Sequence, residues 1–346
     1  MTWTQLTRAQ LIRAQIAGSG IAALSIAQLL SQSGIPYAIE PNSAKPQRWV
    51  LLSSQTVQLL SAIHRTDRFV QIGWPIQRRS VLWGDATDPV TVEHHGISIS
   101  ESRLSDELRS RLRGSHKNTS VLASPDWLIE TQLRANSGVT LIRYGERRTT
   151  FQTVTLRSSA DSHCCVIESV SAGWLFLLPT SSTEAALLCT GYHPEEVLAQ
   201  SRLVTRQMER TSPFSTPVNI APAIAHELIG PGLIRAGSAA LRFDPLCGEG
   251  VGHAAREAYL AAAVLRAANR GEAVQGLLAH YATRLQQAFL RHLLVCRSFY
   301  DVHQETAFWR SELEHLETGI AAIQAGELYT PAMFRFEGLD LKPVTA

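Results

Sequence analysis

Residues 16–41 read IAGSGIAALSIAQLLSQSGIPYAIEP, and this stretch decides the fold. A short, partly apolar segment, residues 12–17, runs into Gly18-Ser19-Gly20, and apolar residues then recur at helical spacing over residues 21–30. The helix ends at Gly34-Ile35-Pro36, and residues 37–39 form a second strand that closes on Glu40. The order of strand, tight turn, helix and strand predicts a Rossmann-like α/β unit.

The small residues of this turn are those that a dinucleotide site needs. Gly18 allows the tight turn, Gly20 lets the backbone approach a pyrophosphate, and Ala23 lets the helix pack closely on the strand. The residues of the turn and first helical turn, Ser19, Ile21 and Ala22, would present backbone N–H groups to the phosphates, and Glu40 would accept hydrogen bonds from a ribose. The alternative is that glycine and alanine only pack a helix on a sheet, and the motif leaves NAD and FAD both open.

A second glycine-rich stretch, residues 232–271, reads GLIRAGSAALRFDPLCGEGVGHAAREAYLAAAVLRAANRG. A short strand leads into a turn interrupted by Pro245, Gly248, Gly250 and Gly252, and an alanine-rich helix is expected over residues 254–268. The N-terminus of such a helix stabilises the negative charge that a flavin gathers on reduction. Two helix termini would then hold the two ends of one FAD, although the turn could equally cap a buried helix.

The composition excludes several other classes of protein. Lys and Arg number 32 against 30 Asp and Glu, and no basic stripe alternates with aromatic residues, so nucleic-acid binding is not expected. The five cysteines lack metal-ligand spacing, so no metal site is expected, and reduced thiols fit the cytoplasm. No signal peptide or membrane-spanning run is recognisable, which predicts a cytoplasmic protein without membrane contact.

Four motifs in order resemble the flavin-dependent aromatic monooxygenase and halogenase superfamily, which has the p-hydroxybenzoate hydroxylase-like fold. They are GSGIAAL with Glu40, ISISESRLSDEL with Arg103, GWLFLLP (residues 173–179), and GSAALRFDPLCGEG (residues 237–250). The resemblance implies a Rossmann-like FAD-binding domain of the glutathione reductase type, a reduced substrate-side antiparallel sheet and C-terminal helices. The expected boundaries are residues 1–115 and 230–346 for the discontinuous FAD domain and residues 116–229 for the sheet domain.

Within that superfamily the chain is most similar to the modifying flavoproteins that accompany lysine and glycine oxidases and quinohemoprotein amine dehydrogenases. The segments DPLCGEGVGHAAREAYLAAAVLRA and YGERRTTFQTVTLR carry this likeness. It implies hydroxylation of an electron-rich ring through a flavin C4a-hydroperoxide, with a tryptophan of a precursor protein as the substrate during cysteine tryptophylquinone formation. FAD, O2, and either NAD(P)H or reduced FAD from a separate flavin reductase are the implied reactants.

The resemblance also assigns cofactor contacts. Arg103 and Arg48 would contact the flavin nucleotide, and the late motif would hold the flavin through Gly237, Ser238, Pro245, Gly248, Glu249, Gly250 and Val251. Three features depart from the family pattern: Ser238 replaces an aspartate that binds the ribityl chain, VLASPDW (residues 121–127) replaces an Asp-Gly element, and Phe176 replaces the second tryptophan of many halogenases.

Residues of the late turn are the candidates for proton transfer. Asp244, Glu249 and His253 could act as acid or base, His253 because it would titrate near neutrality, or each could simply cap the helix. Cys247 could contact flavin or substrate or be inert packing. In the strand GWLFLLP, alternation sends Trp174 and Phe176 to one face, where they could wall a ring-binding pocket or pack a core.

Three other functions remain open from the sequence: a flavin-dependent halogenase, a small-molecule flavin oxidoreductase, and a non-catalytic flavin-binding partner protein. Aromatic residues of the predicted helices over residues 281–310, namely Phe299, Tyr300, Phe308 and Trp309, are either core or a docking patch for a polypeptide, and their burial distinguishes the two.

Overall fold

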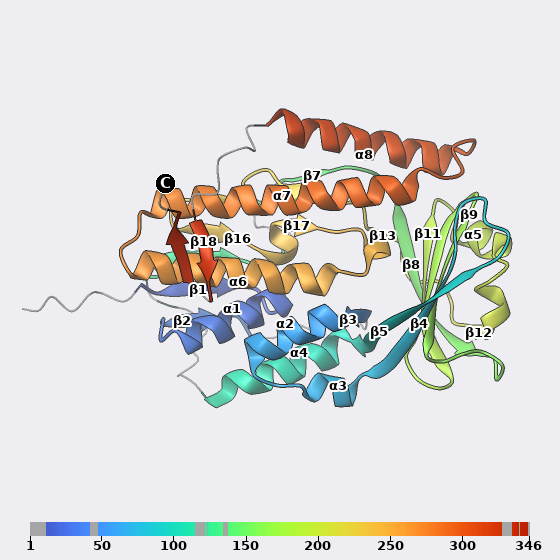
Figure 1. The fold of residues 1–346 in the computed structure, drawn as a ribbon, viewed down its shortest axis with the longest axis horizontal. Coiled ribbons are helices and arrows are strands. Elements are labelled where there is room, and N and C mark those ends of the chain that lie inside the picture. The colour runs from blue at the N-terminus through green and yellow to red at the C-terminus, as the bar shows by residue number, and fades with distance from the viewer. Residues whose placement is uncertain are drawn as a thin grey trace, which may run out of the picture.

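The computed structural model describes residues 12–41, 48–114, 122, 124–133, 138–326, 334–338 and 340–344. Long helices gather at one end of the molecule and a large sheet forms the other end (Figure 1). Among the described residues, no helix is both long enough and apolar enough to span a bilayer.

The N-terminal unit has the predicted order of strand, turn, helix and strand. Strand β1 (Ala14–Ala17) pairs in parallel with β2 (Tyr37–Ile39), and helix α1 (Ile21–Gln32) connects them. Gly20 is the N-cap of α1, and Gly34 follows the helix with a φ of 67°, the left-handed conformation that ends it. Almost every side chain of α1 is buried, because the helix packs between the sheet and other helices.

The cofactor-side sheet has five strands in the order β15-β16-β6-β1-β2. Its remaining strands are β6 (Trp127–Glu130), β15 (Ile229–Gly230) and β16 (Leu233–Arg235). Strand β6 pairs in parallel with both β1 and β16, so a strand from the late part of the chain completes the sheet that the opening residues begin. The α/β class predicted from the sequence is therefore confirmed.

The second sheet is larger than the reduced sheet that the resemblance implied. Its order is β12-β8-β11-β10-β9-β4-β5-β3, with β13 beside β8. The strands are β3 (Trp49–Ser53), β4 (Trp74–Leu82), β5 (Val90–Ser100), β8 (Arg148–Leu156), β9 (Cys164–Val170), β10 (Gly173–Pro179), β11 (Glu184–Gly191), β12 (Met208–Thr211) and β13 (Val218–Asn219). Neighbouring strands are antiparallel except β4 and β9, which pair in parallel and make the sheet mixed.

The two sheets do not follow the expected boundaries at residues 115 and 230. Strands β3, β4 and β5 come before residue 115 yet belong to the larger sheet, and β6 comes after it yet belongs to the cofactor-side sheet. The reason is long-range pairing, because β4 finds its partner β9 far along the chain and β6 inserts between β1 and β16. Residues 1–11 and 115–121 of the expected boundaries lie outside the described residues.

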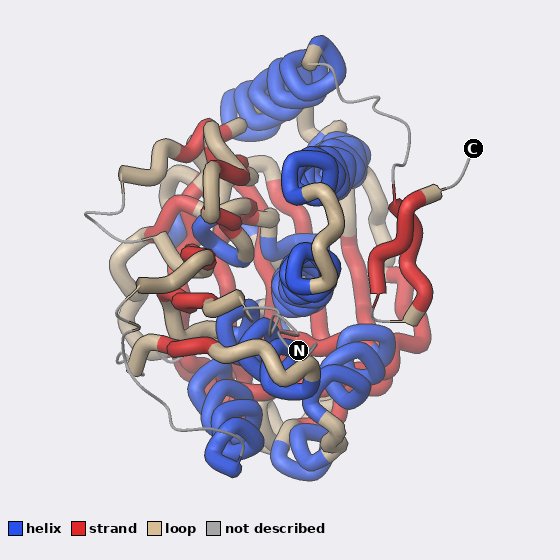
Figure 2. Tube along the Cα trace, turned by 90° about the vertical axis from the view of Figure 1, so that its left-hand side faces the viewer, coloured by secondary structure: helices blue, strands red, loops and turns tan. Residues whose placement is uncertain are grey.

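Three long helices pack side by side, with the middle one in contact with the other two. They are α6 (Gly250–Asn269), α7 (Val274–Tyr300) and α8 (Ala307–Ala325), and they lie one above another in Figure 2. Shorter helices are α2 (Ser54–His64), α3 (Arg68–Ile72), α4 (Glu101–Ser110) and α5 (Pro194–Gln200). A three-stranded sheet of β7 (Leu141–Arg143), β14 (Ala223–Ala225) and β17 (Leu241–Arg242), and a hairpin of β18 (Phe334–Glu337) and β19 (Asp340–Pro343), complete the fold.

Helix α6 begins four residues earlier than the sequence suggests, at Gly250. Gly252 lies inside its first turn, where a Cβ would come within 2.6 Å of Thr56 Oγ1 on α2 and 2.7 Å of Glu249 Oε2. The glycine therefore serves close packing of two helices rather than a break in the helix.

Strand β10 divides two apolar cores. Trp174, Phe176 and Leu178 pack in the core shared with the helices, whereas Leu175 and Leu177 pack in a smaller core on the other face of the sheet. The predicted alternation of this strand is confirmed, and all five side chains are buried.

Candidate flavin site

The opening turn is a tight bend that only glycine can form. Gly18 has a φ of 137°, and a Cβ built there would collide with Thr131 Oγ1 after β6. The Ser19 N–H donates to Gln132 Oε1 at 3.1 Å, and Arg109 Nη2 on α4 donates to the Ser19 carbonyl at 3.2 Å. The Ser19 hydroxyl is buried and has no hydrogen-bond partner among the described residues, and Ser19 does not line the cavity described below.

Substitution at the two glycines of this turn is expected to separate folding from cofactor binding. Gly18→Ala should lower the free energy of unfolding of the flavin-free protein by about 1–3 kcal/mol or more, because the φ is strained and the methyl group meets Thr131. Gly20 has a φ of −82°, and the nearest atom to an added Cβ, Gln132 Nε2, is 3.5 Å away, so Gly20→Ala should cost less than about 1 kcal/mol. Urea unfolding measures both, and equal losses would contradict the geometry.

Flavin titration completes that comparison. Because Gly20 lines the cavity described below, its added methyl group should weaken FAD binding in a protein that remains folded. Fluorescence quenching of added FAD measures this affinity.

The late motif meets the opening turn directly. Gly237 has a φ of 57°, and a Cβ there would lie 3.0 Å from Ala22 Cβ and 2.9 Å from the Thr131 carbonyl. The Gly237 N–H donates to Glu257 Oε2 on α6 at 2.6 Å. The two glycine motifs, separated by most of the sequence, therefore lie against each other, which one shared ligand requires.

A cavity of about 290 Å³ opens between the two motifs. From the opening region it is lined by Gly20, Ile21, Ala22, Val50, Glu101, Thr131 and Gln132, and from the late region by Gly237, Ser238, Leu241, Arg242, Phe243, Gly250, Val251, Ala254 and Glu257. The N-termini of α1 and α6 both border it, so two sets of free helix N–H groups face one space. An added Cβ at Gly250 would meet no atom within 4 Å, which shows open space beside the helix start.

Other predicted cofactor contacts lie outside this cavity. Glu40 follows β2 at the edge of the cofactor-side sheet, and its N–H donates to the Ile16 carbonyl. Arg48 is exposed, with its guanidinium 5.6 Å from the centre of the Phe151 ring. Arg103 is exposed on α4, and it is Arg109, six residues later on the same helix, that reaches the opening turn. Arg109 belongs to a basic cluster whose sequence looks like a solvated helix face.

The loop from Asp244 to Gly248 is held in one conformation. The Asp244 side chain accepts a hydrogen bond from Leu246 N–H at 2.8 Å, Pro245 begins a single 3₁₀ turn, and Gly248 closes it with a φ of 65°. Pro245 and Gly248 do not line the 290 Å³ cavity, although this turn leads directly into α6.

Asp244 belongs to a fully buried ion cluster, centred on Arg147, that the sequence did not reveal. Arg147 Nε lies 2.9 Å from Asp244 Oδ2, and Arg147 Nη1 donates to Glu312 Oε2 at 2.8 Å. The Tyr300 hydroxyl donates to the same Asp244 oxygen at 2.8 Å and accepts from Trp174 Nε1 at 2.9 Å. Trp174 is thus a buried hydrogen-bond donor, and the Asp244 carboxylate is already occupied by Arg147, Tyr300 and a backbone N–H.

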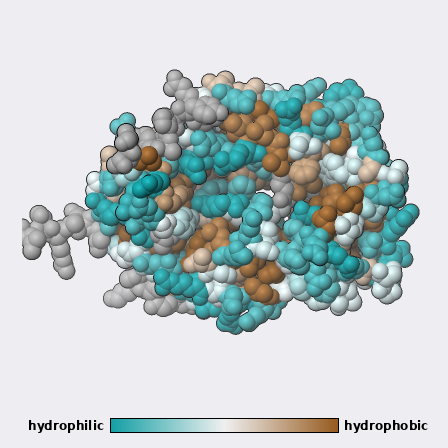
Figure 3. All heavy atoms as spheres, viewed as in Figure 1, coloured by the Kyte–Doolittle hydropathy of each residue, from teal (hydrophilic) through white to brown (hydrophobic). Residues whose placement is uncertain are grey.

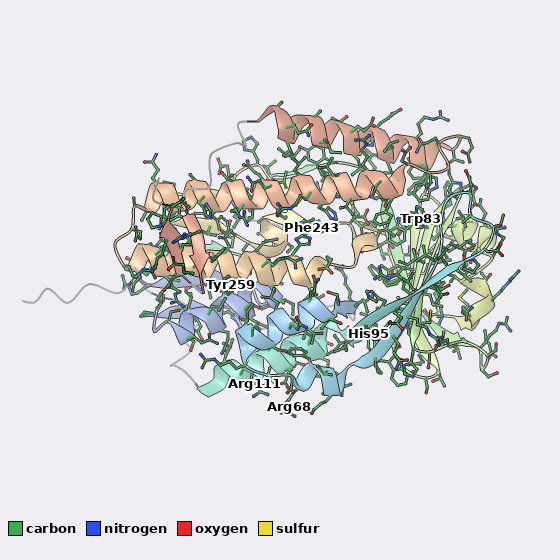
Figure 4. The ribbon with its side chains drawn as sticks, viewed as in Figure 1. Arg68, Trp83, His95, Arg111, Phe243 and Tyr259 are labelled. Atoms are coloured by element: carbon green, nitrogen blue, oxygen red, sulfur yellow. The ribbon has the colours of Figure 1, made fainter. Side chains whose placement is uncertain are left out.

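Two histidines lie behind the loop. His253 stacks on Phe243 with ring centres 3.7 Å apart, and His292 Nε2 accepts the Asp244 N–H at 2.8 Å. Phe243 lies between α6 and α7 in Figure 4. Burial, followed by the nearby Arg256 and Arg291 charges, lowers the pKa of His253 to about 3. The expectation that His253 titrates near neutrality is therefore wrong, and the ring is neutral at pH 7.

The other predicted site residues are Glu249, Phe176 and Cys247, and the first two lie in different environments. Glu249 is partly exposed beside the loop and pairs with Arg256 at 3.2 Å. Phe176 is buried in the core shared with the helices. The side chain of Cys247 lies outside the described part of the chain.

The combination of this cofactor-side sheet, the two apposed glycine turns and the large mixed sheet defines the fold of flavin-dependent halogenases and FAD-dependent monooxygenases. CmlS, a flavin-dependent halogenase, is 17% identical over 91% of this chain and 71% of that chain, with a TM-score of 0.75. QhpG, a peptidyl tryptophan dihydroxylase essential for tryptophylquinone cofactor biogenesis, is 17% identical over 97% of this chain and 86% of its own, with a TM-score of 0.70.

PqsL from Pseudomonas aeruginosa, a probable FAD-dependent monooxygenase, is 15% identical over 91% of this chain and 100% of that chain, with a TM-score of 0.67. No family model and no curated protein matches the sequence. The fold that the sequence resemblance implies is thus confirmed.

Proposed function

We propose that this protein is an FAD-dependent monooxygenase that adds oxygen to an electron-rich aromatic ring. The observation that carries the proposal is the single cavity bordered by both glycine motifs and by the N-termini of α1 and α6. A dinucleotide with a redox-active ring fits a space that has a helix N-terminus for its phosphates and a second helix N-terminus for its ring.

The residues present fit FAD. The N–H groups of Ile21 and Ala22 would bind phosphate, and Glu40 would accept from the adenosine ribose. Ser238 and Glu257 offer a hydroxyl and a carboxyl group to the ribityl chain, and Gly250 and Val251 bring the α6 N-terminus to the flavin ring. Bound FAD, reduced by NAD(P)H or by a separate flavin reductase, supplies activated oxygen from O2.

The protein's own task is to fix the late loop and exclude water. Asp244 does this by its bonds to Arg147, Tyr300 and Leu246, so we assign it to loop geometry rather than to proton transfer. Glu249 is the carboxylate of the loop that reaches solvent, and we assign it the proton-transfer role. His253 is neutral and stacked on Phe243, and in this assignment it packs the helix start.

For the substrate we propose a tryptophan side chain in a partner polypeptide. The support is the sequence likeness to modifying flavoproteins of tryptophylquinone formation, together with a fold shared with QhpG, which acts on a peptidyl tryptophan. Halogenation of an indole or phenol is the second candidate, because CmlS, a flavin-dependent halogenase, has the same fold.

The test begins with the flavin-loaded protein, a candidate precursor polypeptide, O2 and NADH, NADPH or a flavin reductase. We expect the polypeptide to gain the mass of oxygen at tryptophan, with the label when heavy-isotope O2 is used. A gain of chlorine or bromine in the presence of halide would identify a halogenase. Oxygen uptake without product would indicate a small-molecule oxidoreductase, and bound flavin that no reductant reduces would indicate a non-catalytic partner; either would overturn the proposal.

A further inference from the structure

A second and larger hollow runs between α6 and α7. It has a volume of about 770 Å³ and carries four arginines in its walls, Arg79, Arg256, Arg284 and Arg291. We call it the arginine groove. Figure 3 shows the face of the molecule hollowed near its centre, between these helices.

The charge of the arginine groove is positive. Arg256 is paired with Glu249 at 3.2 Å, and Arg79 Nη2 lies 3.2 Å from His94 Nε2. Arg284 and Arg291 are exposed on α7 and have no ion pair among the described residues. The other acid in the wall, Glu257, is buried, and burial raises its pKa to about 8, so it contributes little negative charge at pH 7.

The arginine groove adjoins the candidate flavin site. Glu257 lines both hollows, and Leu246, Glu249 and His253 of the late loop and first turn of α6 also line the arginine groove. A ligand seated in the groove would therefore reach the start of α6, where the flavin ring is proposed to lie.

The rim favours an extended ligand. Val295 and Phe299 on α7 and Phe336 on β18 line the groove while remaining 45%, 39% and 40% exposed. Arg284 and Arg291 stand seven residues apart on α7, which separates them by about 10.5 Å along the helix axis. Two acidic residues three positions apart in an extended chain are separated by about 10 Å.

We propose that the arginine groove binds an extended, acidic segment of the substrate polypeptide, with carboxylates at Arg284 and Arg291 and apolar side chains on Val295 and Phe299. This proposal rests on the proposed function, since it names the chemistry of the partner that presents the aromatic ring. A charged segment also accounts for two unpaired arginines on a surface with exposed aromatic side chains.

The test uses the FAD-loaded full-length protein and short dye-labelled peptides in fluorescence anisotropy. One peptide carries a tryptophan between two glutamates three residues apart, and its partner carries glutamines instead. The acidic peptide should bind, the glutamine peptide should bind about 5- to 30-fold more weakly, and affinity should fall between about 50 and about 300 mM sodium chloride.

Matched variants locate the binding. Arg284→Gln with Arg291→Gln should weaken the acidic peptide by about 5- to 30-fold. Arg297→Gln is the control, because Arg297 is on the same helix but outside the groove, and its guanidinium pairs with Glu317 at 3.9 Å. The visible spectrum of bound flavin should be the same in all variants, which excludes misfolding.

Equal binding of the two peptides, or no effect of the double substitution, would overturn the proposal. Displacement of the acidic peptide by an equal concentration of indole-3-acetate would also overturn the proposal, because the groove would then bind a small carboxylate and not an extended segment. Peptide binding without oxygen transfer would support the groove assignment and contradict the proposed reaction. Oxygenation of free indoles without peptide binding would support the proposed reaction and contradict the groove assignment.

Discussion

Arg147→Met is expected to lower the free energy of unfolding by about 3–5 kcal/mol. Arg147 is completely buried and lies between the carboxylates of Asp244 and Glu312, with its guanidinium carbon 4.2 Å from the centre of the Tyr300 ring. Without the guanidinium, two carboxylates remain in the core with their countercharge removed. Urea unfolding followed by circular dichroism measures the loss.

Two controls define the cause. Arg157→Met removes an exposed arginine that follows β8 and should change stability by no more than about 0.5 kcal/mol. Adding Glu312→Gln to Arg147→Met removes one stranded charge and should recover part of the loss. A single-variant loss below about 1 kcal/mol would show that the cluster does not hold the core together.

The same substitution bears on the cofactor. Asp244 is held by Arg147 and in turn caps the turn that leads into α6, so loss of Arg147 should also weaken FAD binding. Flavin titration below the unfolding transition separates this effect from global instability.

Glu257 is expected to make the stability of the flavin-free protein depend on pH. Burial raises the pKa of Glu257 to about 8 from an ordinary value of 4.5, despite opposing effects of the Gly237 hydrogen bond and Arg256. The folded state thus holds a proton that the unfolded chain releases between these values. Stability from this group is complete below about pH 4.5 and is lost as the pH rises through about 8, by up to about 1.4 kcal/mol per pH unit.

Glu257→Gln should flatten that slope. The amide oxygen can still accept the Gly237 N–H, and the side chain no longer titrates. The difference in unfolding free energy between the wild type and Glu257→Gln, measured at intervals from pH 5 to pH 9, isolates the contribution of this group. Glu314→Gln, at an exposed position on α8, is the control. Parallel pH curves for wild type and Glu257→Gln would contradict the assignment.

The parts of the fold that depend on local pattern follow from the sequence. The β1-α1-β2 unit, the alternation of β10 and the late helix all arise from turn chemistry and periodicity within a short window. Local pattern does not predict the sheets to which β4 and β6 belong, because β4 pairs with β9 and β6 pairs with β1, each far away in the sequence.

The site divides in the same manner. The glycine motifs predict which backbone surrounds the cavity, since Gly18 and Gly237 have positive φ values and close neighbours that leave no room for a Cβ. The sequence does not predict side-chain contacts between distant segments. Nothing in it marks Arg147 as buried, and Arg109 lies in a basic cluster that resembles a solvent-exposed helix face, whereas in the structure Arg147 pairs with Asp244 and Arg109 donates to the Ser19 carbonyl. Burial is the deciding quantity for Tyr300, Phe308 and Trp309, which are core, and for Phe299, which is not.

The contact between Gly237 and Ala22 has a consequence for how the chain matures during translation. Helix α1 leaves the ribosome well before Gly237, which packs against Ala22 and follows it by 215 residues. Nascent or prematurely released chains lack one wall of the pocket. Yellow colour retained through gel filtration should therefore report that the late motif has been synthesised and has folded against the opening turn.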